Sequence, residues 1–328
     1  MEMISLDRSG NICKSVLEVI GNTPLVQLSR LTKDLDGNIF AKLEYLNPGF
    51  SKKDRIALQM IEEAEESGVL KPNQTVVELT SGNTGTGLAI VCGNKGYPFV
   101  AVMSKGNTNE RARMMRALGA EVVLVEQAPG SIPGTVSGES LELVERETNR
   151  IVKERGAFRC DQFDLTGNFN AWYLSATKEI LQQTDGKIGG FCDFMGTGGT
   201  FAGLCKAFKE FNPEIKCYII EPSNAAVIAG KTVLRKGDHK IQGGGYSMSE
   251  LKFLQGAHID GALQVTDEEA YTTTRRLAKE EGIFAGPSSG ANVYGALQLL
   301  QGPLKGKNVL VVLSDSGLKY LSTDLWQT

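Results

Sequence analysis

The sequence predicts an α/β fold built on mostly parallel sheet. Short apolar segments with the length of buried strands alternate with longer segments that have the apolar spacing of helices, and this alternation is typical of parallel sheets. Two of the strand segments run into loops rich in Gly, Ser and Thr that open the next helix. The chain has 328 residues, of which 41% are hydrophobic, so it is long enough for one large or two medium domains.

Composition and charge exclude several classes of function. The 35 Lys and Arg residues are scattered among 38 Asp and Glu residues, which predicts no nucleic-acid partner. Residues 1–10 show no cleavable signal pattern and no apolar run is long enough to span a bilayer, so we expect a cytoplasmic enzyme without a membrane partner. The six cysteines occur singly and are expected to be reduced core residues. Only His239 and His258 are present, so no metal site is predicted.

Residues 20–26 are expected to be a turn that runs into a strand, and residues 39–44 another strand. Two adjacent lysines, Lys52 and Lys53, follow where a loop gives way to a helix. Ser51 is a candidate N-cap. The helix is predicted by apolar side chains at helical spacing: Ile56, Met60, Ile61 and Ala64.

Lys53 is the candidate catalytic residue. The positive end of the helix dipole disfavours a cation in the first turn and should lower the pKa of Lys53, which suits an amine that forms a Schiff base. Neighbouring side chains on a helix point about 100° apart, so we expect only one lysine of the pair to reach a ligand. The alternative is that both lysines are solvated surface charges.

A second candidate site follows the apolar strand at residues 75–79. The loop at residues 80–85 has the sequence TSGNTG and opens a helix that runs to Lys95, so its hydroxyls, amide and backbone N–H groups could bind an anion. The alternative is a plain strand-to-helix turn.

Further strands are predicted at residues 99–103 and 121–125. The Gly/Pro/Ser-rich segment 128–138 could be a mobile lid or an inert excursion.

The chain crosses into a second domain near residues 158–163. There a strand at 191–195 runs into the loop GTGGT at 196–200 and a helix to 211, which is a candidate phosphate cradle. Glu221 ends the next strand and gives a spacing similar to a dinucleotide fingerprint, so an NAD-dependent oxidoreductase is an alternative. The third glycine of that fingerprint falls on Phe201, and a cradle for one phosphate fits at least as well.

The motifs occur in an order that resembles the cysteine synthase and cystathionine β-synthase family, the fold-type II group of pyridoxal-phosphate enzymes. The resemblance implies a tryptophan synthase β-like fold with two open, mostly parallel, twisted sheets flanked by helices, and a homodimer. It also implies a smaller domain, 44–160, and a larger domain formed by 1–43 and 161–328. The motifs that carry it are NTPL at Asn22, SKKDR at Ser51, TSGNTG at Thr80, QF at Gln162, GTGGT at Gly196, SSGA at Ser288 and YLST at Tyr320.

The resemblance also assigns roles to individual residues. Lys53 would bond covalently to pyridoxal 5'-phosphate, Asn83 would bind its ring hydroxyl, and Ser288 would face its pyridine nitrogen. The cofactor phosphate would be held by Gly196, Thr197, Gly198, Gly199 and Thr200. The substrate carboxylate would be bound by Thr80, Ser81, Thr84 and Gln162.

The implied activity is β-replacement on an amino acid through an aminoacrylate intermediate. The simplest version is a cysteine synthase that uses O-acetylserine or a similarly activated serine plus sulfide. The alternative within the family is β-replacement or β-elimination on serine or cysteine, and elimination from cysteine would release sulfide. Several departures leave the donor and the nucleophile open. Lys52 stands where the family usually has an apolar residue, residues 175–179 and 243–248 differ from the usual motifs, and the closing motif is SDSGLKY.

Overall fold

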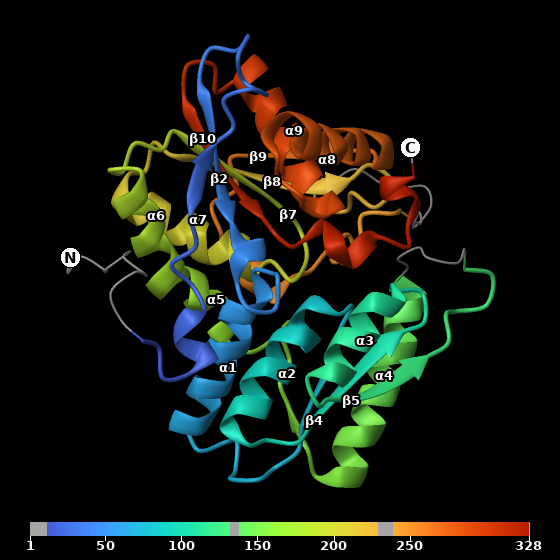
Figure 1. Cartoon of the computed structure of the whole chain (residues 1–328). Helices are drawn as coiled ribbons and strands as arrows, with labels where there is room; N and C mark the ends of the chain where they lie inside the picture. The colour runs from blue at the N-terminus through green and yellow to red at the C-terminus, as the bar shows by residue number, and fades with distance from the viewer. Residues whose placement is uncertain (1–11, 132–137, 229–238, 328) are drawn as a thin grey trace.

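The computed structural model describes residues 12–131, 138–228 and 239–327, and its two sheets, each flanked by helices, confirm the predicted α/β fold (Figure 1). The larger sheet has the order β1-β2-β10-β7-β8-β9, and only the pairing of β1 with β2 is antiparallel. Its strands are β1 (Leu25–Gln27), β2 (Asn38–Leu43), β7 (Gly190–Phe194), β8 (Lys216–Pro222), β9 (Gly261–Val265) and β10 (Asn308–Leu313).

The smaller sheet is entirely parallel and has the order β5-β4-β3-β6. It occupies the lower half of the view in Figure 1, with α2, α3 and α4 around it, whereas α8 and α9 lie together against the larger sheet. Its strands are β3 (Val76–Leu79), β4 (Phe99–Ser104), β5 (Glu121–Val125) and β6 (Phe158–Arg159). The proposed domain limits at 44, 160 and 161 stay predictions.

The helices fall close to their predicted positions. A one-turn π-helix, Ala171–Ala176, joins α5 to α6. The α-helices are α1 (Lys53–Glu66), α2 (Asn83–Lys95), α3 (Asn109–Ala117), α4 (Gly138–Arg155), α5 (Gly167–Asn170), α6 (Thr177–Gln183), α7 (Gly199–Phe211), α8 (Asp267–Glu281) and α9 (Pro287–Gln301). Short 3₁₀ turns occupy Val16–Val19, Glu44–Leu46, Lys252–Leu254, Gly317–Tyr320 and Asp324–Trp326.

Hydrophobic burial explains these elements. The four apolar residues predicted to form the inner face of α1 are 4% exposed or less, which confirms the stripe. Strand β7 is buried along its whole length, as expected for a central parallel strand with helices on both faces. Helix α8 begins with a capping box in which Thr266 and Glu269 bind each other's backbone N–H groups.

Loops from the two ends of the chain meet at the carboxyl ends of the strands. Lys52 N–H donates to Ser314 O at 2.8 Å, and Ser51 forms an isolated antiparallel bridge with Asp315. The start of α1 is therefore held beside the end of β10. In open α/β sheets ligands bind at this edge.

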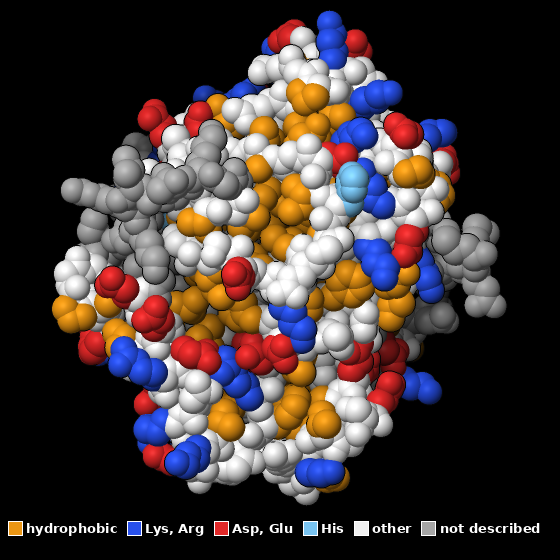
Figure 2. Space-filling view, turned by 180° about the vertical axis from the view of Figure 1, so that it is seen from behind, with side chains coloured by type: hydrophobic (Ala, Val, Ile, Leu, Met, Phe, Trp, Pro, Cys, Tyr) orange, Lys and Arg blue, Asp and Glu red, His pale blue; other side chains and the backbone are white. Residues whose placement is uncertain are grey.

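Four sequence expectations concern the surface, the loops and membrane spans. Five cysteines are buried, but Cys13 is exposed, so the expectation of a core position is wrong for that residue. The segment predicted to be a lid falls mainly on residues 132–137, which lie outside the described residues. Lys and Arg lie among Asp and Glu around a central hydrophobic area on the face in Figure 2. No helix in the described part of the chain is long and apolar enough to cross a bilayer.

Candidate active site

A cavity that is partly open to solvent lies at the carboxyl edge where β7, β10, α1 and α9 converge. It brings together most of the residues predicted to bind a cofactor, although Gly199 is not part of its wall. The lining residues are Lys52, Lys53, Asn83, Asp193, Phe194, Met195, Gly196, Thr197, Gly198, Thr200, Gln242, Gly243, Ser288 and Ser314.

Lys53 is the first residue of α1 and is half-buried at the wall of this cavity. Burial, followed by the charge of Lys52, lowers the pKa of Lys53 to about 7, while Asp193 and Glu78 oppose the shift. The predicted direction agrees, but the main cause is desolvation instead of the helix dipole. Among the described residues, no hydrogen bond or ion pair engages Lys53 Nζ, so the amine is free to react.

Lys52 also lines this cavity, and the expectation that only one lysine of the pair reaches a ligand stays a prediction. The helix begins one residue later than the Ser51 cap implied: Lys52 is the N-cap, and Ser51 Oγ accepts the N–H of Lys53 at 3.3 Å. Lys52 is only 9% exposed because its ammonium binds Asp193. The alternative of two solvated lysines is therefore wrong.

The loop at 196–200 has the geometry of an anion cradle. Gly198 has φ +84°, a left-handed conformation that favours glycine, and it is the N-cap of α7. Thr197 Oγ1 accepts a hydrogen bond from Asn168 Nδ2 at 2.8 Å, which fixes the loop against α5. A Cβ on Gly199 would lie 2.3 Å from Asn168 Oδ1, so glycine is required for this close packing. The N-terminus of α7 thus presents backbone N–H groups to the cavity.

Asn83 is held from both ends of its amide. Its Nδ2 donates to Asp315 Oδ2 at 2.8 Å, and its Oδ1 accepts from Lys319 Nζ at 2.7 Å. Lys319 also donates to Gly49 O at 2.8 Å, and burial lowers the pKa of Lys319 to about 8. Sequence analysis missed this pair, which comes from the SDSGLKY motif. One hydrogen of the Asn83 amide remains for a ligand.

The residues predicted to bind a carboxylate lie beside the cavity, not in its wall. Thr84 Oγ1 donates to Gln162 Oε1 at 2.6 Å, and Gln162 Nε2 donates to Leu79 O at 3.0 Å. Thr80 Oγ1 accepts the N–H groups of Gly82 and Gly85, both at 2.9 Å, and so shapes the loop. Ser81 follows in the same loop, where its carbonyl oxygen accepts from Arg111 at 2.6 Å.

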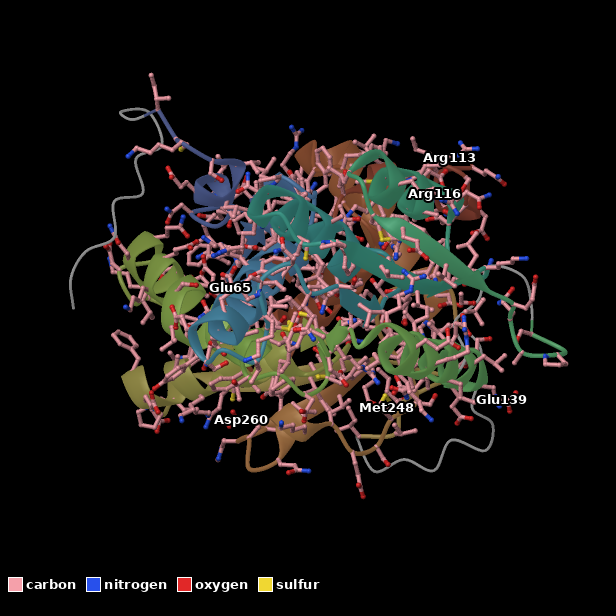
Figure 3. The ribbon with its side chains drawn as sticks, turned by 90° about the horizontal axis from the view of Figure 1, so that it is seen from below. Glu65, Arg113, Arg116, Glu139, Met248 and Asp260 are labelled. Carbon is pink, nitrogen blue, oxygen red and sulfur yellow. The ribbon has the colours of Figure 1, made fainter. Side chains whose placement is uncertain are left out.

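A second cavity of about 340 Å³, mostly apolar and partly open to solvent, lies beyond this loop. Its walls come from α4, β6 and the loop at 246–248, and Figure 3 shows Met248 beside α4, whose first turn carries Glu139. Tyr246 lines the cavity, and its hydroxyl lies 3.4 Å from Ser81 Oγ. The second cavity therefore adjoins the loop at 80–85.

Comparison with known proteins decides the family. A model described as "Pyridoxal-phosphate dependent enzyme" matches residues 16–315. The chain is 41% identical to the cysteine synthase of Staphylococcus aureus over 317 residues, 95% of this chain and 96% of that protein. The chain belongs to the pyridoxal-phosphate-dependent enzymes of the cysteine synthase type.

Solved structures agree with this family. A hydrogen sulfide-producing enzyme from Fusobacterium nucleatum has a TM-score of 0.86 and 37% identity, covering 94% of this chain and 100% of that one. O-acetylserine sulfhydrylase isoform 3 from Entamoeba histolytica has a TM-score of 0.88 and 32% identity, covering 98% and 94%. The enzyme therefore has the fold-type II architecture that the sequence predicted.

The cavity fits pyridoxal phosphate chemically. It combines a free amine of lowered pKa, a loop with N–H and hydroxyl donors, and a neutral hydroxyl from Ser288, which is 6% exposed. Gln242 Oε1, at the cavity wall, is buried without a hydrogen-bond partner among the described residues, so a bound ligand can satisfy it. Phe201 is fully buried where a dinucleotide site needs its third glycine, and the family match decides against the NAD alternative.

Asp193 is the main functional candidate that sequence analysis missed. It lies in β7, which is otherwise apolar and fully buried, and a carboxylate there needs a charged or hydrogen-bonded partner. The signal was available: an acid inside a buried strand, and an unexplained lysine beside Lys53. Their pairing spans 141 positions in the sequence and is visible only in the fold.

Proposed function

We propose that this enzyme catalyses β-replacement as a cysteine synthase, converting O-acetylserine or a similarly activated serine and sulfide into L-cysteine. The observation that carries the proposal is the free Lys53 amine in a cavity that also presents the 196–200 loop and Ser288. Lys53 would bond to the cofactor, and Asn83 would bind its ring hydroxyl. The phosphate would be held by Gly196, Thr197, Gly198, Gly199 and Thr200.

The chemistry divides between cofactor and protein. Pyridoxal phosphate, when bound, supplies an electron sink at the substrate α-carbon. With the cofactor bound, Lys53 would be the base that takes the substrate α-proton, and the leaving group would then depart from the β-carbon with its electron pair. The hydroxyl of Ser288 does not hold a proton on the pyridine nitrogen as a carboxylate would, which favours expulsion of the leaving group. Sulfide then adds at the β-carbon.

The substrate carboxylate would be bound by Thr80, Ser81, Thr84 and Gln162. The support is the hydrogen bonding of Gln162 and Thr84. One N–H of the Gln162 amide donates to Leu79 O and the other remains for a ligand, while the Thr84 hydroxyl fixes the orientation of that amide. Burial of these groups strengthens their hydrogen bonds to an anion.

A second candidate function is β-replacement by a nucleophile larger than sulfide. The second cavity, which adjoins Ser81 through Tyr246, favours it because sulfide needs no such volume. Elimination from cysteine with release of sulfide is the remaining alternative, and the similarity to the hydrogen sulfide-producing enzyme of Fusobacterium nucleatum gives it weight.

A donor and acceptor panel tests the proposal. The holoenzyme is mixed with O-acetylserine, O-phosphoserine, serine or cysteine, each with sulfide, with homocysteine or with no acceptor. Amino-acid products and released sulfide are quantified. We expect the fastest formation of cysteine from O-acetylserine plus sulfide. Faster formation of cystathionine, or faster sulfide release from cysteine alone, would replace this proposal with one of the two alternatives.

We also propose a homodimer that works in the cytoplasm. The support for a dimer is the family resemblance together with exposed apolar side chains on two loops. The two loops adjoin, because Ser316 N–H donates to Phe50 O at 3.1 Å. Phe50, Leu318 and Leu321 are 44%, 51% and 56% exposed. Sedimentation of the wild type and of Leu318→Glu measures the oligomeric state, and a wild-type monomer would contradict the proposal.

A further inference from the structure

Lys52 and Asp193 form a buried ion pair in the wall of the cofactor cavity. Lys52 Nζ lies 3.1 Å from Asp193 Oδ2 and 3.2 Å from Oδ1, and the two side chains are 11% and 2% exposed. Buried ion pairs often cost as much desolvation energy as they return, so stability alone is a weak reason for one. The place of this pair, next to Lys53 at the same cavity, points to a role in the site.

Asp193 is held rigidly by α9, the helix that carries Ser288. Asn292 Nδ2 donates to Asp193 Oδ1 at 3.1 Å and to Val312 O at 2.8 Å, and Asn292 Oδ1 accepts the N–H of Phe194 at 2.7 Å. The carboxylate therefore has a fixed position on β7. Because its two oxygens bind Lys52, the ammonium is fixed as well.

The pair is poorly suited to recruiting an anionic substrate. Both carboxylate oxygens of Asp193 contact the Lys52 ammonium, so the pair has no net charge to offer. A cation meant to bind a substrate carboxylate would not be neutralised in this way. The pair is instead placed to act electrostatically on the neighbouring residue, Lys53.

Three charged or titratable groups act on Lys53: Lys52 from the helix cap, Asp193 from β7 and Glu78 from β3. Burial raises the pKa of Glu78 well above its usual range. Lys52 opposes protonation of Lys53, whereas Asp193 and, to a smaller extent, Glu78 favour it. Lys52 and Asp193 are the two of these groups that bind each other.

We propose that Lys52 and Asp193 are a pair of positioning residues that adjust the proton affinity of Lys53 in opposite directions, Lys52 lowering it and Asp193 raising it. The inference rests on the proposed role of Lys53 as the lysine that bonds to the cofactor. Neither residue takes part in bond making. Each acts through its charge, and the two charges are locked together so that neither dominates.

The test is the pH dependence of cofactor capture by the apoenzyme. The rate at which the lysine–cofactor absorption band grows is measured from pH 5 to 10 for wild type, Lys52→Met, Asp193→Asn and the double variant. Ionisation of pyridoxal phosphate itself is common to all four, so differences report on Lys53. A charge within ~4–6 Å shifts a pKa by about 1–3 units. We expect the midpoint to rise by about 1 pH unit in Lys52→Met, to fall by about 1 in Asp193→Asn, and to return to within about 0.5 in the double variant.

Lys95→Met is the matched control. Lys95 binds Glu65 at 2.7 Å and is also largely buried, but it lies at the far end of α2, ~18 Å from Asn83 along the helix. The midpoint of the pH profile of cofactor capture by Lys95→Met should equal that of the wild type. Thermal unfolding of each variant shows that it is folded, and if Lys52→Met does not fold, Asp193→Asn alone must still lower the midpoint.

Borohydride reduction and peptide mapping separate two kinds of failure. Cofactor attached at a lysine other than Lys53 would overturn the proposed function. Attachment at Lys53 with unchanged midpoints, or with both single variants shifted in the same direction, would overturn the role of the pair alone. A purely structural role would weaken cofactor binding without shifts of opposite sign.

Discussion

Gln162 and Thr84 provide the sharpest test of the substrate site. Gln162→Ala removes the amide donor proposed to bind the substrate carboxylate, and Thr84→Val removes the hydroxyl that binds Gln162 Oε1 at 2.6 Å. Both side chains are at least 94% buried, so water replaces the lost donors poorly. The hydrogen of the Thr84 hydroxyl is already given to Gln162, which makes Thr84 an orienting residue more than a second donor.

The magnitudes follow from this geometry. Loss of one hydrogen bond to a charged group costs ~1.5–3 kcal/mol, so Gln162→Ala should raise the dissociation constant of the amino acid about 10- to 150-fold. Loss of the neutral hydrogen bond from Thr84 costs ~0.5–1.5 kcal/mol, or about 3- to 10-fold. Because Thr84 acts through Gln162, the double variant should bind no more weakly than Gln162→Ala by itself.

The assay is titration of the holoenzyme with L-alanine, which has the carboxylate and amine of a substrate but no leaving group, followed by cofactor absorbance. Thr148→Val is the control, since Thr148 is also buried and donates to Val144 O at 2.8 Å, but on α4. Multiplicative effects in the double variant would refute the orienting role of Thr84. Loss of the resting cofactor band in Gln162→Ala would refute the assignment of this pair to the carboxylate.

Three further predictions concern other parts of the molecule. Lys53→Ala should lose the covalent link to the cofactor and essentially all turnover, and mapping of the borohydride-reduced wild type to another lysine would contradict this. Ser288→Asp should keep the cofactor but slow leaving-group release, measured as acetate formed from O-acetylserine, whereas Ser288→Ala should be milder; equal rates would remove Ser288 from the mechanism. Burial acts to raise the pKa of Glu179, but Arg55 and Lys42 outweigh it and hold the value at about 2. The enzyme should therefore lose stability as the pH falls from about 4.5 towards 2, and Glu179→Gln should flatten this dependence in urea unfolding at each pH; an unchanged slope would assign the acid sensitivity elsewhere.

The elements of the fold could be predicted because their signals are local. The stripe on α1 and the apolar strands β3, β4 and β7 follow from hydrophobic spacing within a few residues. The loop at 196–200 was identified in the same way, since its glycines and threonines are contiguous. The start of α1 was misplaced by one residue because Ser51 is the residue type that prefers the cap position, whereas the backbone places Lys52 there.

The pairings inside the site could not be predicted because they join distant segments. Lys319 binds Asn83 across 236 positions, and Lys52 binds Asp193 across 141. Nothing near Lys52 in the sequence shows that an acid will face it. The composition of the site was therefore accessible from sequence, whereas the hydrogen bonds that orient its members depend on tertiary contact.

The arrangement of three amines explains why Lys53 is the one that can react. Lys52 binds the carboxylate of Asp193, and Lys319 is held by Asn83 Oδ1 and Gly49 O. Both amines therefore donate hydrogen bonds to fixed acceptors. Within the described residues no acceptor engages Lys53 Nζ, so burial favours its neutral form, with the pKa at about 7.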